Sequence, residues 1–103
     1  MKVIIKKPGE QYGYTCDIEN TLENLQNIVG GYIETVPGIN GSLIVCNEEG
    51  KLKDLKINMP YYDDTLCGTI IVCGVSGEDF GDVPITFDEW KKYVDSQMEL
   101  LNK

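Results

Sequence analysis

The stretch LENLQNIVGGYIETV, residues 22–36, changes its hydrophobic period at a pair of glycines. Before the pair, Leu22, Leu25 and Val29 recur at spacings of three and four, as on one face of an amphipathic helix. After the pair the residues alternate in polarity, as in a half-buried strand. Gly30 supplies the left-handed residue that commonly ends a helix. The stretch therefore predicts a helix followed at once by a strand.

Two helices are expected, and each has a start signal. Asn20 is a candidate N-cap for the first helix, with Glu23 three residues later as its capping-box partner. A second capping box, Thr86 to Glu89, opens a C-terminal helix over about 86–101. Its apolar residues recur at helical spacing, so one side of this helix should face a core.

Strands are expected wherever short apolar or alternating runs are bounded by glycine and proline. These runs cover residues 1–7, 12–16, 32–36, 42–46, 52–57 and 68–73. The intervening residues 58–64 and 74–84 are rich in glycine, proline and acidic residues, and we expect them to be loops. The fold class is therefore α+β: a mainly antiparallel sheet of about four to six strands, with two helices forming a single layer on it. All 103 residues fit one domain.

Composition excludes several classes of protein. The chain has no histidine and no arginine, and its 17 acidic residues outnumber nine lysines, for a net charge of −8. Such a charge repels nucleic acid and anionic membranes, so direct nucleic-acid binding and membrane binding are not expected. Neither a membrane-spanning stretch nor a leader peptide is visible, which predicts a cytoplasmic location.

The four cysteines are expected to be reduced and structural. Cys16, Cys46, Cys67 and Cys73 form no C-x-x-C pair, and no histidine is present to complete a zinc site. The acidic pairs and clusters at 63–64 and 78–82 lack the alternating ladder of calcium loops. We therefore predict no metal site and no cofactor.

The motif NEEGK at 47–51 has the composition of a hairpin tip. Glu48 and Glu49 are adjacent on this tip, where their side chains diverge and stay exposed, so they are poor candidates for an acid–base pair. The serines lack a histidine, and no cysteine has an evident base. We predict no catalytic residues and no enzyme.

One polar and aromatic constellation is a candidate ligand-binding site. Lysines recur along the predicted strand at 52–57, and amides and tyrosines lie near them in sequence. Lysine charge, amide hydrogen bonds and tyrosine faces together suit a base or a ribose phosphate. The candidate ligand-binding residues are Asn47, Lys51, Lys53, Lys56, Asn58, Tyr61 and Tyr62.

A resemblance to a known family rests on three segments: LENLQNIVGGYIETV at 22–36, NEEGKLKDLKIN at 47–58 and GTIIVCG at 68–74. In this order and spacing they resemble the family called domain of unknown function 3846, over roughly residues 1–84. The resemblance implies a small protein of phages and mobile elements, with no established activity or catalytic residues. The family's leucine-proline-x-asparagine stretch is incomplete here, since residues 55–58 read LKIN.

The hypothesis that follows is a non-enzymatic binding protein of a phage or mobile element, a counter-defence factor that occupies a host component stoichiometrically. In one mode its acidic surface masks a basic host defence protein. In the alternative mode it is a sponge for a small host signalling nucleotide, held between the subunits of a homo-oligomer. A small enzyme of unknown reaction is the third class.

Overall fold

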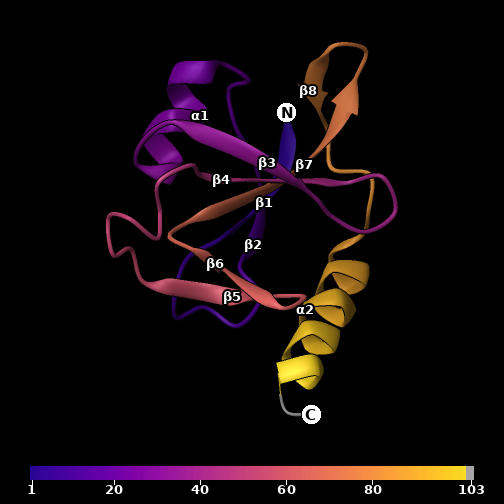
Figure 1. The fold of residues 1–103 in the computed structure, drawn as a ribbon. Coiled ribbons are helices and arrows are strands. Elements are labelled where there is room, and N and C mark those ends of the chain that lie inside the picture. Colours follow the sequence, from indigo (N-terminus) through magenta and orange to yellow (C-terminus); the bar gives the residue numbers. More distant parts are fainter. Residues whose placement is uncertain (102–103) are drawn as a thin grey trace.

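The computed structural model describes residues 1–101, which form eight strands and two helices (Figure 1). In chain order they are β1 (Lys2–Lys6), β2 (Tyr14–Asp17), α1 (Leu22–Val29), β3 (Ile33–Pro37), β4 (Leu43–Asn47), β5 (Ile57–Tyr61), β6 (Asp64–Cys67), β7 (Ile70–Ser76), β8 (Asp79–Gly81) and α2 (Phe87–Leu101). The main sheet is antiparallel with the order β2-β1-β7-β4-β3, and β8 extends it by pairing with the end of β7. A separate hairpin consists of β5 and β6. The predicted α+β class with a mainly antiparallel sheet is confirmed.

The centre of the sheet is β7, where four consecutive residues, 70–73, are fully buried. This strand pairs with β1 on one side and with β4 on the other. Both faces of its apolar run are covered, as the continuous run GTIIVCG at 68–74 predicts for a central strand. β1 therefore lies next to the centre of the sheet. Its partner on the central side, β7, follows about seventy residues later in the chain.

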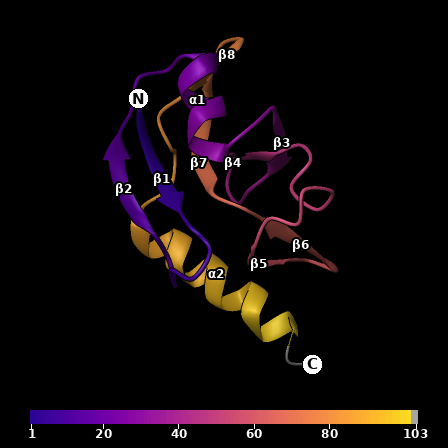
Figure 2. The ribbon, with the colours of Figure 1, turned by 90° about the vertical axis from the view of Figure 1, so that its left-hand side faces the viewer.

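The two helices lie on opposite faces of the sheet, so the prediction of a single helical layer is wrong (Figure 2). Leu25 and Val29 of α1 pack with Val3 and Ile71, whose side chains point to one face. Trp90 of α2 packs in a second core on the other face. This core contains Ile4 and Val72, whose side chains alternate along their strands with those of the first core. Because the central strands are apolar on both faces, each face needs a cover.

The first helix begins at a different cap from the predicted one. Thr21, not Asn20, is the N-cap, and its Oγ1 accepts a hydrogen bond from the backbone N–H of Asn24 at 3.1 Å. The helix ends at Gly30, which has φ +83°, and its N–H donates to the Gln26 carbonyl at 2.8 Å. The left-handed stop is confirmed, and the start lies one residue further on.

The second helix has the predicted capping box. The N–H of Glu89 donates to Thr86 Oγ1, and the N–H of Thr86 donates to Glu89 Oε1, both at 3.1 Å. The buried face is Trp90, Tyr93, Val94 and Gln97. The Trp90 indole N–H also donates to the Tyr12 carbonyl, 2.8 Å away, which ties α2 to the segment before β2.

Residues 48–67 differ most from expectation. The predicted strand at 52–57 is a run of turns up to Asp54, with Leu52 85% exposed, and β5 begins only at Ile57. The predicted loop at 58–64 is instead most of the β5–β6 hairpin, which reverses at 62–63. Buried Met59 and Leu66 place this hairpin in the same core as α2. The hairpin therefore shares with α2 the task of covering one sheet face.

The predicted loop at 74–84 is partly ordered as strand. β7 continues to Ser76, turns at Gly77, which has φ +63°, and returns as β8. This hairpin projects beyond the sheet (Figure 1). Within residues 1–101 no helix combines the length and apolar character needed to span a membrane.

Candidate functional site

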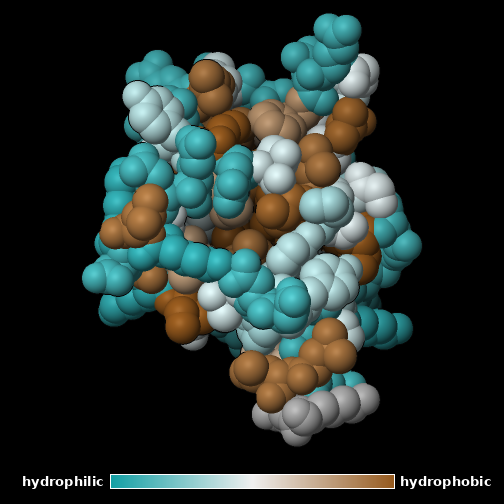
Figure 3. All heavy atoms as spheres, viewed as in Figure 1, coloured by the Kyte–Doolittle hydropathy of each residue, from teal (hydrophilic) through white to brown (hydrophobic). Residues whose placement is uncertain are grey.

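A hollow of about 430 Å³ lies between the β3–β4 edge of the sheet and the β5–β6 hairpin. Its walls come from β3, β4, the turn after β4 and β6, with Tyr61 from β5. Figure 3, which faces this side of the molecule, shows hydrophobic atoms recessed among hydrophilic ones. The charged residues that line the hollow are Glu34, Glu48, Glu49, Lys51 and Asp64.

The hollow exists because the NEEGK segment turns away from the sheet. Asn47 Oδ1 accepts a hydrogen bond from the Glu49 N–H at 2.8 Å, and its Nδ2 donates to the Val29 carbonyl at 3.2 Å. Gly50 lies so close to β6 that an added Cβ would be 3.1 Å from the Cys67 carbonyl oxygen. The predicted hairpin tip is instead a packed turn that contacts α1, β4 and β6, because β4 pairs with β3 and β7 whereas β5 pairs with β6. Its two glutamates are among the residues that line the hollow.

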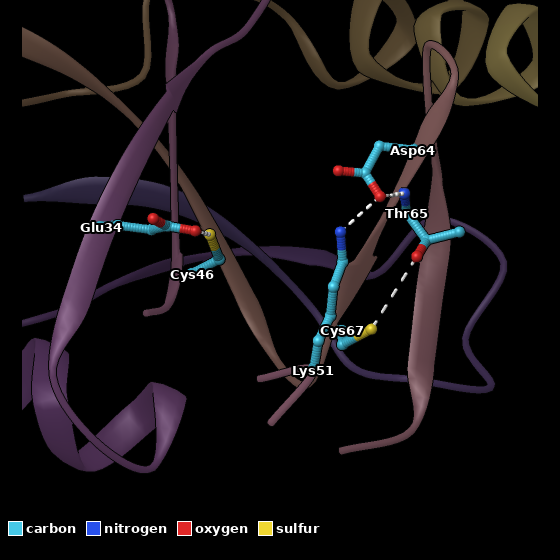
Figure 4. Close-up of polar contacts among 6 residues, drawn as sticks. All are labelled: Glu34, Cys46, Lys51, Asp64, Thr65 and Cys67. Atoms are coloured by element: carbon cyan, nitrogen blue, oxygen red, sulfur yellow. Dashed lines mark hydrogen bonds and ion pairs between the residues drawn. The ribbon is translucent and has the colours of Figure 1, made fainter. Parts of the chain in front are cut away.

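The electrostatics of the hollow favour a cation. Four carboxylates line it against one ammonium, and that ammonium, on Lys51, is already paired with Asp64 (Figure 4). The pKa of Lys51 is raised by this hydrogen bond. The pKa of Asp64 is lowered by Lys51 and by the Thr65 N–H, which donates to it at 2.8 Å. The unpaired charge in the hollow is therefore negative.

The Cys46 thiol of the hollow is not activated. Cys46 Sγ points at Glu34 Oε1, 3.8 Å away (Figure 4). Burial first, and then the nearby Glu34 carboxylate, raise the pKa of Cys46 to about 12. A thiol with so high a pKa is protonated near neutral pH and is a poor nucleophile. All four cysteines are free, as predicted, and Cys46, Cys67 and Cys73 are buried.

The structure keeps only part of the predicted ligand site together. Lys51 and Tyr61 line the hollow, as does Asn47, whose side-chain amide is engaged in the turn. The Tyr61 hydroxyl donates to the Pro37 carbonyl at 2.7 Å and fastens the hairpin to the end of β3. These three residues are therefore partly structural, and an anion at Lys51 would have to share the ammonium with Asp64.

The other predicted residues are dispersed. Lys53 and Lys56 are exposed outside the hollow, because residues 51–54 form turns and the alternation of a strand does not apply. Asn58 is engaged with buried Lys6: its Oδ1 accepts from the Lys6 ammonium at 2.9 Å, and its Nδ2 donates to the Lys6 carbonyl at 2.7 Å. Tyr62 is exposed at the hairpin turn, edge-on to Tyr61 with ring centroids 4.9 Å apart.

Two acidic residues of the hollow were missed from the sequence, Glu34 and Asp64. The β3–β4 register places Glu34 opposite Cys46, and the Asn40-Gly41 turn, with positive φ at both residues, was a visible sign of that pairing. Asp64 had no comparable signal, because the hairpin that carries it was expected to be a loop.

In chemical terms the hollow can hold an ammonium or guanidinium group between carboxylates. Among residues 1–101 no group of three or more cysteine and acidic side chains is arranged to hold a metal ion. The Cys46 thiol, whose pKa is raised, is not an activated nucleophile although the Glu34 carboxylate lies beside it. The arrangement suits binding by charge and shape.

Comparison with known proteins gives one match. Residues 1–95 match the family described as Domain of unknown function (DUF3846). The chain belongs to this family. The DUF3846 match extends past residue 84 into α2, further than the resemblance seen in the sequence. No curated protein and no solved structure matches the chain.

Proposed function

We propose that this DUF3846 protein is a non-enzymatic binding protein whose acidic hollow docks on a basic segment of a partner protein. The observation that carries the proposal is the composition of the hollow, which is lined by four acidic residues and by one lysine that is paired with one of them, Asp64. An arginine or lysine side chain entering between Glu34 and Glu49 would gain charge-assisted hydrogen bonds. The net charge of −8 would steer a basic partner toward the protein over a longer range.

The same ion pair favours this mode over the nucleotide sponge. A phosphate at Lys51 would share the ammonium with Asp64 and would also face Glu34, Glu48 and Glu49. Like charges in one small site oppose binding. The two tyrosines expected to stack on a base are divided, because Tyr61 is bonded to β3 and Tyr62 lies outside the hollow.

The biological role we propose is counter-defence by stoichiometric occupancy. A phage or mobile-element protein that covers the basic surface of a host defence protein in the bacterial cytoplasm would mask the nucleic-acid groove of that protein. The acidic balance of the chain supports this role, because nucleic-acid grooves are basic.

The proposal is tested with short charged peptides and two variants of equal net charge. Glu34→Gln/Glu49→Gln removes two charges from the hollow, and Glu19→Gln/Glu99→Gln removes two exposed charges elsewhere. We expect fluorescently labelled hexa-arginine to bind the wild type and the control similarly by anisotropy. The hollow variant should bind about tenfold more weakly, as expected for the loss of charge-assisted contacts.

Two results would contradict the proposal. Equal weakening in both variants would mean that the peptide senses only the overall charge. A rise in melting temperature with cyclic dinucleotides or ADP-ribose, and none with hexa-arginine, would favour the sponge instead. Hexaglutamate is the negative control, and no binding is expected.

A further inference from the structure

Within residues 1–101 no strand pairs with the outer edge of β3, and the hydrogen bonds of its flanking residues show which backbone groups point outward. The Glu48 N–H donates to the Tyr32 carbonyl at 2.8 Å, and the Gly38 N–H donates to the Ser42 carbonyl at 2.9 Å. In an antiparallel pair, hydrogen-bonded and non-bonded positions alternate. In the β3–β4 register the even-numbered residues of β3 therefore form backbone hydrogen bonds with β4. The backbone N–H and C=O groups of Ile33 and Thr35 face away from the sheet.

These outward groups form a short pairing edge. Among residues 1–101 no hydrogen bond to the outward N–H and C=O groups of Ile33 and Thr35 is present, and Thr35 is exposed. The edge ends at Pro37, which has no N–H and whose carbonyl is taken by the Tyr61 hydroxyl. A free strand edge of this kind is a template for an added strand.

The edge adjoins the acidic hollow. Glu34 and Val36 have side chains on the face that lines the hollow, whereas Ile33 packs in the core on the other face. In a strand added to β3, the residue opposite Glu34 would have its side chain on the hollow side, about 5 Å from Glu34 between Cβ atoms. An arginine or lysine there would lie beside the Glu34 carboxylate, with its long side chain extending toward the hollow.

We propose that the basic partner segment binds in extended conformation, as an added antiparallel strand on β3 whose arginine or lysine side chains face Glu34 and the hollow. This inference rests on the proposed function and specifies how the partner is held. Charge selects the occupant: a second copy of this chain would place its own acidic edge, within a net charge of −8, against Glu34. A basic segment instead gains backbone hydrogen bonds and charge pairing together.

The geometry predicts which backbone amides of a peptide matter. A residue directly opposite Ile33 or Thr35 bonds through its backbone and points its side chain to the α1 face. The residue opposite Glu34 points its side chain to the hollow and its N–H to solvent. In an alternating arginine–valine octapeptide, the valine amides should therefore pair with β3, and the arginine amides should not.

The test uses three peptides with identical side chains: the unmodified octapeptide, one N-methylated at the valines and one N-methylated at the arginines. We expect N-methyl-valine to weaken binding about tenfold and N-methyl-arginine to leave it within about twofold, by isothermal calorimetry. In the protein, Thr35→Pro removes an outward N–H and should also weaken binding about tenfold. Thr15→Pro is the matched control, because Thr15 is exposed and its backbone faces outward on the opposite edge strand, β2.

The outcomes separate this inference from the proposed function. If both N-methylated peptides bind equally well while Glu34→Gln/Glu49→Gln still weakens binding, strand addition is wrong and docking by charge stands. If none of the arginine peptides binds, the proposed function itself fails. Circular dichroism and melting temperatures show whether each of the two proline variants is folded. If Thr35→Pro does not fold, the peptide series on the wild-type protein still tests strand addition.

Discussion

At the residue scale, Asn58 shows how a polar residue with the chemistry of a ligand contact is used inside the fold. Its side chain bonds to both the ammonium and the carbonyl of Lys6, and to the Gly68 carbonyl at 2.8 Å. Lys6 is only 2% exposed, and burial lowers its pKa. Asn58 therefore supplies the acceptors that a buried ammonium needs, and it joins β1 to the start of the β5–β6 hairpin.

This arrangement predicts a strong effect of Asn58→Leu on stability. The change removes the side-chain acceptor from the Lys6 ammonium and leaves the charge poorly solvated, so the free energy of unfolding should fall by about 3 kcal/mol. Adding Lys6→Met should recover part of the loss, because the buried charge is then gone. Urea denaturation measures both effects. Asn27→Leu, at an exposed position of α1, is the control, and a loss as large as that of Asn58→Leu would contradict the explanation.

The candidate site was predictable from sequence only where a residue's role depends on local spacing. NEEGK was identified as a turn from its composition, and the structure places its glutamates at the hollow. The strand expected over 52–57 is wrong, because residues 51–54 form turns, so the lysines placed on it do not share one face of a strand. Whether Lys51 is free or paired depends on Asp64, thirteen residues away on another strand, and no periodicity in the sequence reports such a contact.

At the element scale, the sequence predicted those elements whose hydrophobic period is long and uninterrupted. β1, α1, β4, the centre of β7 and α2 all have such patterns. The β5–β6 hairpin was missed because Pro60 and an irregular register near Ile57 disturb its alternation. β8 was missed because it lies beyond the core, where Val75, its partner in β7, is 59% exposed and no apolar alternation is needed. The continuous apolar run at 68–74 predicts a central strand buried on both faces, but it does not tell whether a helix or another element covers each face.

The corrected start of α1 can be tested by mutation. Because Thr21 Oγ1 accepts the Asn24 N–H, Thr21→Ala should lower the free energy of unfolding by about 1 kcal/mol, the usual effect of losing an N-cap. Glu23→Gln should change it by less than about 0.5 kcal/mol, because the capping box expected from Asn20 and Glu23 is not what caps this helix. Thermal or urea denaturation distinguishes the two, and a larger effect of Glu23→Gln would restore the predicted box.

At the scale of the whole molecule, the excess of acidic residues is hardly compensated. Seventeen acidic residues face nine lysines, and within residues 1–101 a single ion pair, Lys51 with Asp64, has its charged atoms within 4.0 Å. Most carboxylates therefore repel one another across the surface. Such repulsion keeps a protein soluble and opposes its compact state.

The repulsion predicts a stability that rises with salt. Between 20 and 300 mM sodium chloride, screening should raise the melting temperature by about 4 °C, equivalent to roughly 1 kcal/mol for a domain of this size. The variant Glu19→Lys/Glu99→Lys, which reduces the net charge at exposed positions, should show a smaller rise. Differential scanning calorimetry measures both. A melting temperature that is independent of salt in the wild type would show that the surface charges do not oppose folding.

The place of β1 next to β7 has a consequence for how the chain acquires its structure. β1 is made first, yet its neighbour toward the centre of the sheet, β7, emerges from the ribosome only after some seventy more residues. Closing so long a loop costs chain entropy before any contact compensates it, and folds built on such distant pairings form slowly. A nascent chain that stops short of β7 leaves β1 with only its edge partner β2, so this domain is committed to folding late, when translation of the sheet is complete.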